Sequence, residues 1–251
     1  MNDERDRGAA GSPGPNGAVR GVGGGRTRES SQGSAANAVP GQGPRVGVLS
    51  LQGDFACHRR TLEALGVEAV RVTLPRDLAG LDALILPGGE STTMLRLLES
   101  TGLRAPLEAF VRDRPVLGTC AGIILLGTEV SPLPHPPFAV LDVTVERNAY
   151  GRQIDSFSAE VEAPVLGGPF HAVFIRAPRI RRIGAGVEPI ARRGEEPVGV
   201  RSGRTVGLCF HPELTQDLRF HRWFLERVAN LSLPALAATE SDAAAPGREN
   251  A

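Results

Sequence analysis

The stretch Gly118-Thr119-Cys120-Ala121-Gly122-Ile123-Ile124-Leu125-Leu126-Gly127 places one cysteine between two glycines, where a strand should turn into a helix. Residues 115–118 have the composition of a short buried strand, and residues 123–130 that of an apolar helix. Glycines permit a tight turn and a close approach of neighbouring chain, so the thiol would stand exposed as in a nucleophile elbow. The helix N-terminus behind Cys120 would favour its thiolate form. Many buried cysteines are inert apolar residues, so that alternative stays open at this point.

The composition indicates a globular protein with an aliphatic core. The chain has 251 residues, of which 41% are hydrophobic and only 4% aromatic. Its 28 basic residues, all arginine, balance 28 acidic ones, so the formal net charge is zero. We therefore expect no binding to nucleic acid or to a membrane surface.

The two ends of the chain differ from the middle. Residues 1–44 contain no Leu, Ile or aromatic residue and are rich in Gly, Ser, Pro and Asn, which predicts a disordered extension. A docking segment is the alternative for this extension. Residues 45–233 should form the domain, and the Ala-rich residues 234–251 a flexible tail. Without a signal-peptide pattern or about 18 consecutive apolar residues, the protein is expected in the cytoplasm.

The three cysteines, Cys57, Cys120 and Cys209, are too few and too widely spaced for a disulfide framework or a Cys-x-x-Cys metal pair. We therefore expect reduced thiols.

Short apolar runs alternate with amphipathic segments in the first half of the domain. The pattern predicts strands over 46–51, 67–74, 82–86 and 116–118, and helices over 54–65, 91–99 and 104–112. Such alternation predicts an α/β fold with a single three-layer domain, in which helices cover both faces of a mostly parallel central sheet.

After residue 132 the pattern changes to strands separated by turns. Strands are predicted over 140–145, 156–161, 172–175, 187–191, 198–201 and 205–210, and should extend the sheet with antiparallel pieces. A last helix over 217–230 would turn Phe220, Trp223, Phe224 and Val228 into the core.

Chemically useful residues follow several of these strands, and in such sheets ligands bind beyond the carboxyl ends of the strands. His211 and Glu213 follow an apolar run, and residues two apart in an extended chain face the same way. A histidine held by a carboxylate can take the proton of a thiol. Alone, this pair is equally typical of a surface histidine beside a helix-capping glutamate.

Gly88 and Gly89 lie between a predicted strand and helix. Their backbone N–H groups, with the amide of Ala121, could form an oxyanion hole. An ordinary turn with Ser91 or Thr92 as helix N-cap is the alternative, and both interpretations can hold together.

Arginines next to strands could bind a carboxylate through two parallel hydrogen bonds. The candidates are Arg147, Arg152 and Arg176, and the residue pattern does not choose between Arg147 and Arg152.

At this level of detail the chain resembles a known family. Leu51-Gln52-Gly53, Pro87-Gly88-Gly89-Glu90-Ser91-Thr92-Thr93, the Cys120 elbow, Arg147-Asn148-Ala149-Tyr150-Gly151-Arg152-Gln153, Phe174-Ile175-Arg176-Ala177-Pro178 and Phe210-His211-Pro212-Glu213-Leu214-Thr215 occur in the order typical of the glutaminase subunits of pyridoxal 5'-phosphate synthase, the PdxT family. The resemblance runs over residues 46–231. The elbow and the later His-x-Glu are typical of class I glutamine amidotransferases in general.

The resemblance implies roles for individual residues. Cys120 would be the nucleophile, with His211 and Glu213 completing a catalytic triad. L-glutamine would be bound by Gly89, Glu90, Ser91, Arg147, Ile175 and Arg176, which favours Arg147 over Arg152.

The resemblance also implies the reaction and the partner. The chain would hydrolyse L-glutamine to L-glutamate and ammonia through a cysteine thioester, without cofactor or metal. The ammonia would pass to a barrel-shaped synthase subunit in a large ring complex, with one glutaminase per synthase subunit. Two alternatives are a glutaminase for another synthase, such as that of histidine biosynthesis, and a non-catalytic regulatory subunit of the same fold.

Overall fold

The computed structural model describes residues 43–130, 133–147, 149 and 156–235. Nearly all of the predicted extension (1–44) and tail (234–251) lies outside these residues, as do Tyr150 and Arg152.

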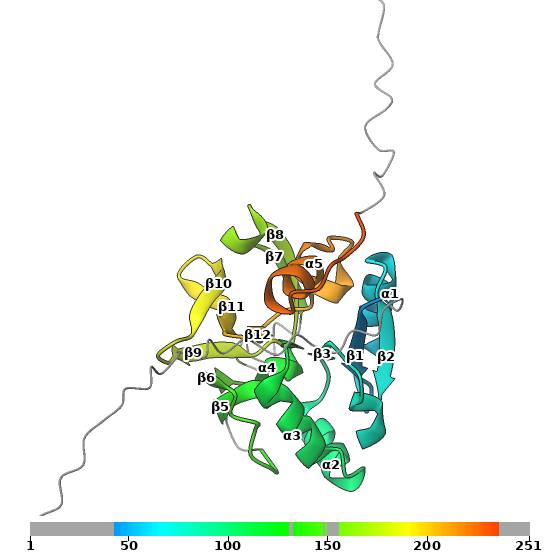
Figure 1. The fold of residues 1–251 in the computed structure, drawn as a ribbon. Coiled ribbons are helices and arrows are strands. Elements are labelled where there is room, and N and C mark those ends of the chain that lie inside the picture. Colours follow the sequence, from blue (N-terminus) through cyan, green and yellow to red (C-terminus); the bar gives the residue numbers. More distant parts are fainter. Residues whose placement is uncertain (1–42, 131–132, 148, 150–155, 236–251) are drawn as a thin grey trace, which may run out of the picture. The chain divides into compact units, whose positions relative to one another are not determined.

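The centre of the domain is a seven-stranded mixed sheet with the strand order β10-β11-β12-β4-β3-β1-β2 (Figure 1). Its five neighbouring strands β2, β1, β3, β4 and β12 are parallel, and β11 and β10 continue the sheet antiparallel. The strands are β1 (Arg45–Leu49), β2 (Glu68–Val72), β3 (Ala83–Leu86), β4 (Val116–Thr119), β10 (Glu188–Arg193), β11 (Glu196–Ser202) and β12 (Thr205–Leu208). The predicted mostly parallel sheet with an antiparallel extension is confirmed.

Helices cover both faces of this sheet. On one face lie α1 (Phe55–Ala64) and α5 (Arg219–Trp223), and on the other α2 (Ser91–Ser100), α3 (Arg104–Asp113) and α4 (Ala121–Leu126). The short turns are η1 (Pro75–Leu78), η2 (Pro164–Leu166) and η3 (Pro212–Leu214), and the π-helical turn η4 (Phe224–Val228) follows α5 directly. The predicted last helix is therefore present as one helical run over residues 219–228 that changes from α to π, and its four apolar residues are buried as expected: Phe220, Trp223, Phe224 and Val228.

Two glycines let α4 pack directly on the sheet. A Cβ at Gly122 would lie 2.1 Å from the carbonyl oxygen of Leu86 on β3, and one at Gly118 would lie 2.6 Å from the backbone carbonyl carbon of Gly122. No side chain fits at either place, because the opposing atoms belong to the backbone. The glycines on either side of Cys120 therefore set how closely the helix that follows it approaches β3 and β4.

The prediction was wrong at the end of α4. The helix stops at Leu126, and residues Gly127–Val130 form the strand β5, which pairs in parallel with β6 (Leu141–Glu146). Glycine and the β-branched residues Thr128 and Val130 favour an extended chain over a helix here.

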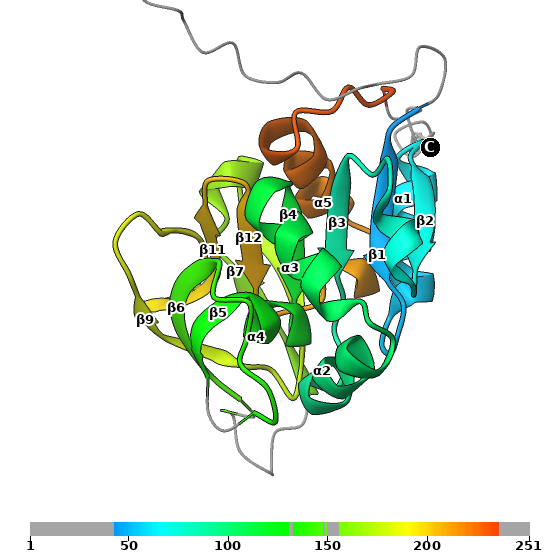
Figure 2. The same ribbon diagram turned by 60° about the horizontal axis from the view of Figure 1, so that its bottom comes forward.

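The sequence pattern also missed β9 (Arg179–Ile183), which completes a three-stranded sheet in the order β5-β6-β9 (Figure 2). It carries three arginines beside the buried Ile180, and two of them, Arg181 and Arg182, pair with acidic residues of β6. Arg182 contacts Asp142 at 2.7 Å, and Arg181 pairs with Glu146. The strands predicted over 156–161 and 172–175 also leave the main sheet, since β7 (Ser156–Val161) and β8 (Phe170–Ile175) form a separate two-stranded sheet.

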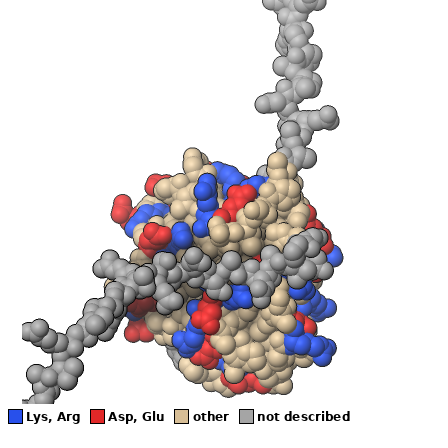
Figure 3. Space-filling view, in the orientation of Figure 1, with Lys and Arg blue, Asp and Glu red and all other residues tan. Residues whose placement is uncertain are grey.

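The surface carries charges of both signs. In Figure 3, basic and acidic side chains are interspersed over the face in view. The side chains visible on this face therefore do not produce a field of one sign that would steer a polyanion.

Candidate active site

Cys120 lies at the corner between β4 and α4, with backbone angles of φ 49° and ψ −101°. Its backbone N–H donates to the carbonyl oxygen of Leu208 on β12 at 2.8 Å, which fixes the corner to the neighbouring strand. The side chain is 7% exposed, and Sγ lies 3.6 Å from the carbonyl oxygen of Ile175. A non-glycine residue in this region of backbone space is strained, and such residues occur mostly at functional sites.

His211 and Glu213 are hydrogen-bonded to each other, as predicted, but by a different local geometry. The strand β12 ends at Leu208, and Glu213 belongs to the single turn η3, for which His211 is the N-cap. The turn folds the glutamate back, so that Oε1 lies 2.8 Å from Nδ1 of His211. The extended-chain argument was therefore wrong, although the pairing that it predicted is present.

The surroundings of His211 favour its charged form. Its ring is buried, which alone would lower its pKa, but the adjacent Cys120 and Glu213 raise that pKa to about 10. Glu213 is also buried, yet His58 and His211 hold the pKa of its carboxyl group well below the usual range. Nε2 of His211, the nitrogen away from Glu213, has no hydrogen-bond partner in the described part of the chain. An ionised glutamate thus orients an imidazole whose other nitrogen is available to a reacting group.

A cavity of about 330 Å³ opens beside Cys120 and His211, within the ordinary range of small-molecule sites, roughly 300–1,000 Å³. All six residues predicted to bind a substrate line it: Gly89, Glu90, Ser91, Arg147, Ile175 and Arg176. They come from the ends of β3, β6 and β8 and from the start of α2. The structure thus brings together residues that lie as much as 159 positions apart, as Gln52 and His211 do.

Glu90 has two functions in the structure. It is the N-cap of α2, and its carboxylate accepts hydrogen bonds from the backbone N–H groups of Thr92 and Thr93 at 3.1 and 2.6 Å. The same carboxylate contacts Arg147 at 3.2 Å. The alternative in which Ser91 or Thr92 caps this helix was wrong, because Glu90 is the cap and its side chain is long enough to reach back to the first turn.

The predicted oxyanion residues lie at the edge of this site. Gly88 is next to the ring of His211, and Ala121 is the first residue of α4, directly after Cys120. Gln52 supports the glycine loop from the end of β1, since its Oε1 accepts a hydrogen bond from the backbone N–H of Glu90 at 2.6 Å.

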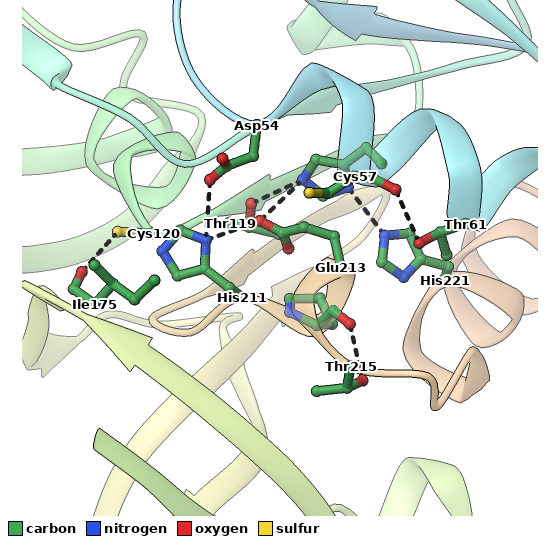
Figure 4. Close-up of polar contacts among 12 residues, drawn as sticks. Asp54, Cys57, Thr61, Thr119, Cys120, Ile175, His211, Glu213, Thr215 and His221 are labelled. Carbon is green, nitrogen blue, oxygen red and sulfur yellow. Dashed lines mark hydrogen bonds and ion pairs between the residues drawn. The ribbon is translucent and has the colours of Figure 1, made fainter. Parts of the chain in front are cut away.

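Four residues that line the cavity were not among the predicted site residues, namely Gln52, Gly53, Asp54 and Ile124. Gln52 and Asp54 follow a predicted strand, so their position at its carboxyl end was the available signal. Ile124 gave none, because its place in an apolar helix is typical of a core residue. Figure 4 shows Asp54 on the far side of His211 from Cys120, with Oδ2 3.6 Å from Nδ1.

Asp54, His211 and Glu213 are also a set of potential metal ligands, with donor atoms within 4.8 Å of one another. Nδ1 of His211 and Oε1 of Glu213 are already engaged with each other at 2.8 Å. The hydrogen-bonded pair therefore accounts for this cluster without an ion.

The sequence matches the SNO glutamine amidotransferase family over residues 48–230. The chain belongs to this family. The match contains Cys120, His211, Glu213 and every residue that lines the cavity.

Curated relatives cover the same region. Proteins named pyridoxal 5'-phosphate synthase subunit PdxT are 51% identical over 185 residues in Pelotomaculum thermopropionicum, 52% over 184 in Thermus thermophilus and 53% over 186 in Deinococcus radiodurans. These alignments cover 72–73% of this chain and 94–96% of the relatives.

Solved structures agree with this assignment. One described as the crystal structure of glutamine amidotransferase is 49% identical, with a TM-score of 0.70 over 74% of this chain and 99% of that one. A chain in a structure of PurLQS from Thermotoga maritima shares the fold at 17% identity, with a TM-score of 0.54 over 74% of this chain and 99% of its own length.

Proposed function

We propose that this chain is the glutaminase subunit of a pyridoxal 5'-phosphate synthase and that Cys120 is its nucleophile. The observation that carries the proposal is the position of Cys120 at the cavity, beside His211, whose Nδ1 is held by Glu213 at 2.8 Å. A thiol, an imidazole and an orienting carboxylate in this order are the parts needed for attack on an amide.

The reaction begins with the proton of the Cys120 thiol transferred to His211, whose charged form the surroundings favour. The thiolate attacks the side-chain amide carbon of L-glutamine, and His211 returns the proton to the amide nitrogen as the C–N bond breaks. Ammonia leaves, and a glutamyl thioester remains on Cys120. Water, deprotonated by His211, then attacks the thioester, the C–S bond breaks, and glutamate is released as the thiol recovers its proton.

The backbone amides of Gly88, Gly89 and Ala121 are the proposed oxyanion hole for the tetrahedral intermediates. Glutamine is held by the residues around the cavity: Gly89, Glu90, Ser91, Arg147, Ile175 and Arg176. Opposite charges meet at one side of the cavity, where Arg147 contacts Glu90 at 3.2 Å. Such a pair suits the α-carboxylate and α-ammonium groups of an amino acid.

The second part of the proposal concerns the partner. The relatives are named as subunits of pyridoxal 5'-phosphate synthase, which supports delivery of the ammonia to a barrel-shaped synthase subunit. The proposed assembly is a ring complex in the cytoplasm, with one glutaminase on each synthase subunit. No helix among the described residues is both long and apolar enough to span a membrane.

Glutamate release from glutamine, measured with the synthase subunit present, tests the nucleophile. We expect Cys120→Ala to lower the rate by at least about 1,000-fold. Cys57→Ala is the matched control, since Cys57 lies on α1 and does not line the cavity. Undiminished release by Cys120→Ala would refute the assignment, and ammonia transfer to a different synthase would refute the partner.

A further inference from the structure

A buried chain of polar side chains continues beyond Glu213, on the side away from Cys120. His58 and His221 are both fully buried. Nε2 of His58 lies 3.4 Å from Oε1 of Glu213, and Nδ1 of His58 lies 3.0 Å from Nε2 of His221. The hydroxyl of Thr119 lies 3.3 Å from Nε2 of His58. The reaction described above makes no use of these three residues.

The cluster joins four separate parts of the fold, and Figure 4 labels three of its members, Thr119, Glu213 and His221. His58 comes from α1, Thr119 from β4, Glu213 from η3 and His221 from α5. Thr119 directly precedes Cys120 in the chain. The cluster therefore connects the elbow to the two helices on one face of the sheet. Buried polar groups are costly unless they are paired, so two buried histidines in contact with each other, one of them also in contact with a catalytic carboxylate, call for a functional explanation.

The contacts determine where the protons lie. Glu213 is held ionised and can only accept hydrogen bonds, so the nitrogen of His58 that faces it must carry a proton. His221 is neutral, because burial lowers its pKa to about 3. A neutral ring has a single N–H, and Nδ1 of His221 has no partner among the described residues. The N–H of His221 is therefore placed on Nε2, where it donates to Nδ1 of His58.

We propose that His58, oriented by His221, is a positioning residue that directs an N–H to Oε1 of Glu213 and so fixes the carboxylate that holds His211. The inference rests on the proposed Cys120–His211–Glu213 triad. Both histidines in contact with Glu213 address the same oxygen, Oε1, while Oε2 has no hydrogen-bond partner in the described chain. His58 thus acts on the atom that orients the catalytic base.

The inference implies a change in pH dependence. Titratable groups face Glu213 from α1 (His58), from the loop before it (Asp54) and from the N-cap of its own turn (His211). The N–H of His58 favours the ionised carboxylate, so its loss raises the pKa of Glu213. Glu213 would then become protonated, and the triad inactive, at a higher pH than in the wild type. The acidic limb of the plot of kcat against pH should therefore shift to higher pH.

Two amide substitutions at one position test this directly. In His58→Gln the amide nitrogen is as many bonds from Cα as Nε2 is, so a donor toward Glu213 remains. In His58→Asn the amide reaches only as far as Nδ1, so that donor is lost. Thr61→Val is the matched control, because Thr61 is buried on the same helix and its hydroxyl donates to the carbonyl oxygen of Cys57.

We expect His58→Asn to lower kcat about tenfold and to leave the KM for glutamine within about twofold. It should also shift the acidic limb of the kcat profile to higher pH. His58→Gln should keep most of the wild-type kcat and its acidic limb, and Thr61→Val should match the wild type. Thermal unfolding midpoints show whether each variant is folded. Wild-type kcat and pH profile in a folded His58→Asn would overturn the proposal. Equal losses in the Asn and Gln variants with an unchanged acidic limb would also overturn it, because they would indicate a packing role.

Nitrogen-15 NMR of the imidazole rings gives a readout without catalysis, and the chain has only five histidines to assign. A protonated Nε2 on His58 at neutral pH supports the inference, and an unprotonated one overturns it. If the wild type releases no glutamate even with the synthase subunit present, the proposed function fails, while the NMR result still decides the His58 contact.

Discussion

The ring of His211 occupies the space that a side chain on Gly88 would need, since a Cβ at position 88 would lie 2.2 Å from Cε1 of His211. The end of β3 and the turn after β12 thus meet in the active site without an intervening side chain. The position of the proposed base therefore depends on the absence of a side chain at residue 88.

We predict that Gly88→Ala inactivates the enzyme without unfolding it. The added methyl group must push the imidazole aside, and a displacement of about 1 Å in a reacting group lowers rates roughly 100-fold. Glutamate release and circular dichroism, measured on the same sample, check this prediction. Gly168→Ala, at a bend without a positive φ where a Cβ meets nothing within 4 Å, is the control for a general effect of glycine replacement. An active Gly88→Ala variant would show that His211 can shift and still catalyse.

Gln52 should control glutamine affinity through the backbone of Glu90. Gln52→Met removes the acceptor that lies 2.6 Å from the Glu90 N–H, while it keeps nearly the same side-chain volume. We expect the KM for glutamine to rise about five- to tenfold, which corresponds to one ordinary hydrogen bond of about 1 kcal/mol. Ser50→Ala is the control. Ser50 lies close to Gln52 in the chain but does not line the cavity, and its hydroxyl accepts a hydrogen bond from Arg71, so its replacement should not change KM. Equal effects of the two variants would contradict the prediction.

Glu90 should stabilise the fold in a pH-dependent way. Burial alone would raise its pKa, but hydrogen bonds from Thr93 and Thr92 lower it from 4.5 to about 2. A carboxylate with a lowered pKa stabilises the folded state above its unfolded-state pKa, and this contribution disappears as the pH falls through the folded-state value. We expect Glu90→Gln to lower the free energy of unfolding by about 1 kcal/mol at neutral pH, as for other N-caps.

Denaturant unfolding of the wild type and Glu90→Gln across a pH series measures this difference. It should be constant above about pH 4.5 and shrink toward zero as the pH approaches 2. A difference that grows on acidification has the opposite sign to the one expected and would rule out the capping role.

The three cysteines should differ in reactivity toward iodoacetamide. Cys209 is 1% exposed, and burial holds its pKa well above the usual range, so it should remain unlabelled in the folded protein. Cys120 borders the cavity and Cys57 is half-buried on α1, so both should react. Glutamine should slow labelling at Cys120 but not at Cys57, and peptide mass spectrometry distinguishes the sites. Labelling of Cys209 as fast as Cys120 would mean that this part of the core opens readily.

Much of the site could be predicted because parallel strands bring the residues after them to one edge of a sheet. Cys120, Gly89 and His211 each follow an apolar run, and that pattern survives in the sequence. The choice of Arg147 over Arg152 came only from family resemblance, because an arginine next to a strand has no local signature.

The remaining features depend on long-range contacts that leave no periodic signal. His58 and His221 occupy ordinary helix positions, and only their meeting across 163 residues distinguishes them from solvent-exposed histidines. No strand was predicted for β9, because the acidic partners of Arg181 and Arg182 lie on another strand. The turn that brings Glu213 back to His211 could not be read from residue spacing, since extended and turned chains can both pair residues two apart.

The strained backbone at Cys120 separates what folding requires from what chemistry requires. Holding a side chain at φ 49° costs about 1–3 kcal/mol, and glycine would adopt the same corner at little cost. Selection for stability alone would therefore replace this cysteine, and only selection for reactivity can keep it. At residue 120, the amino acid that the reaction requires is not the one that would make the folded protein most stable.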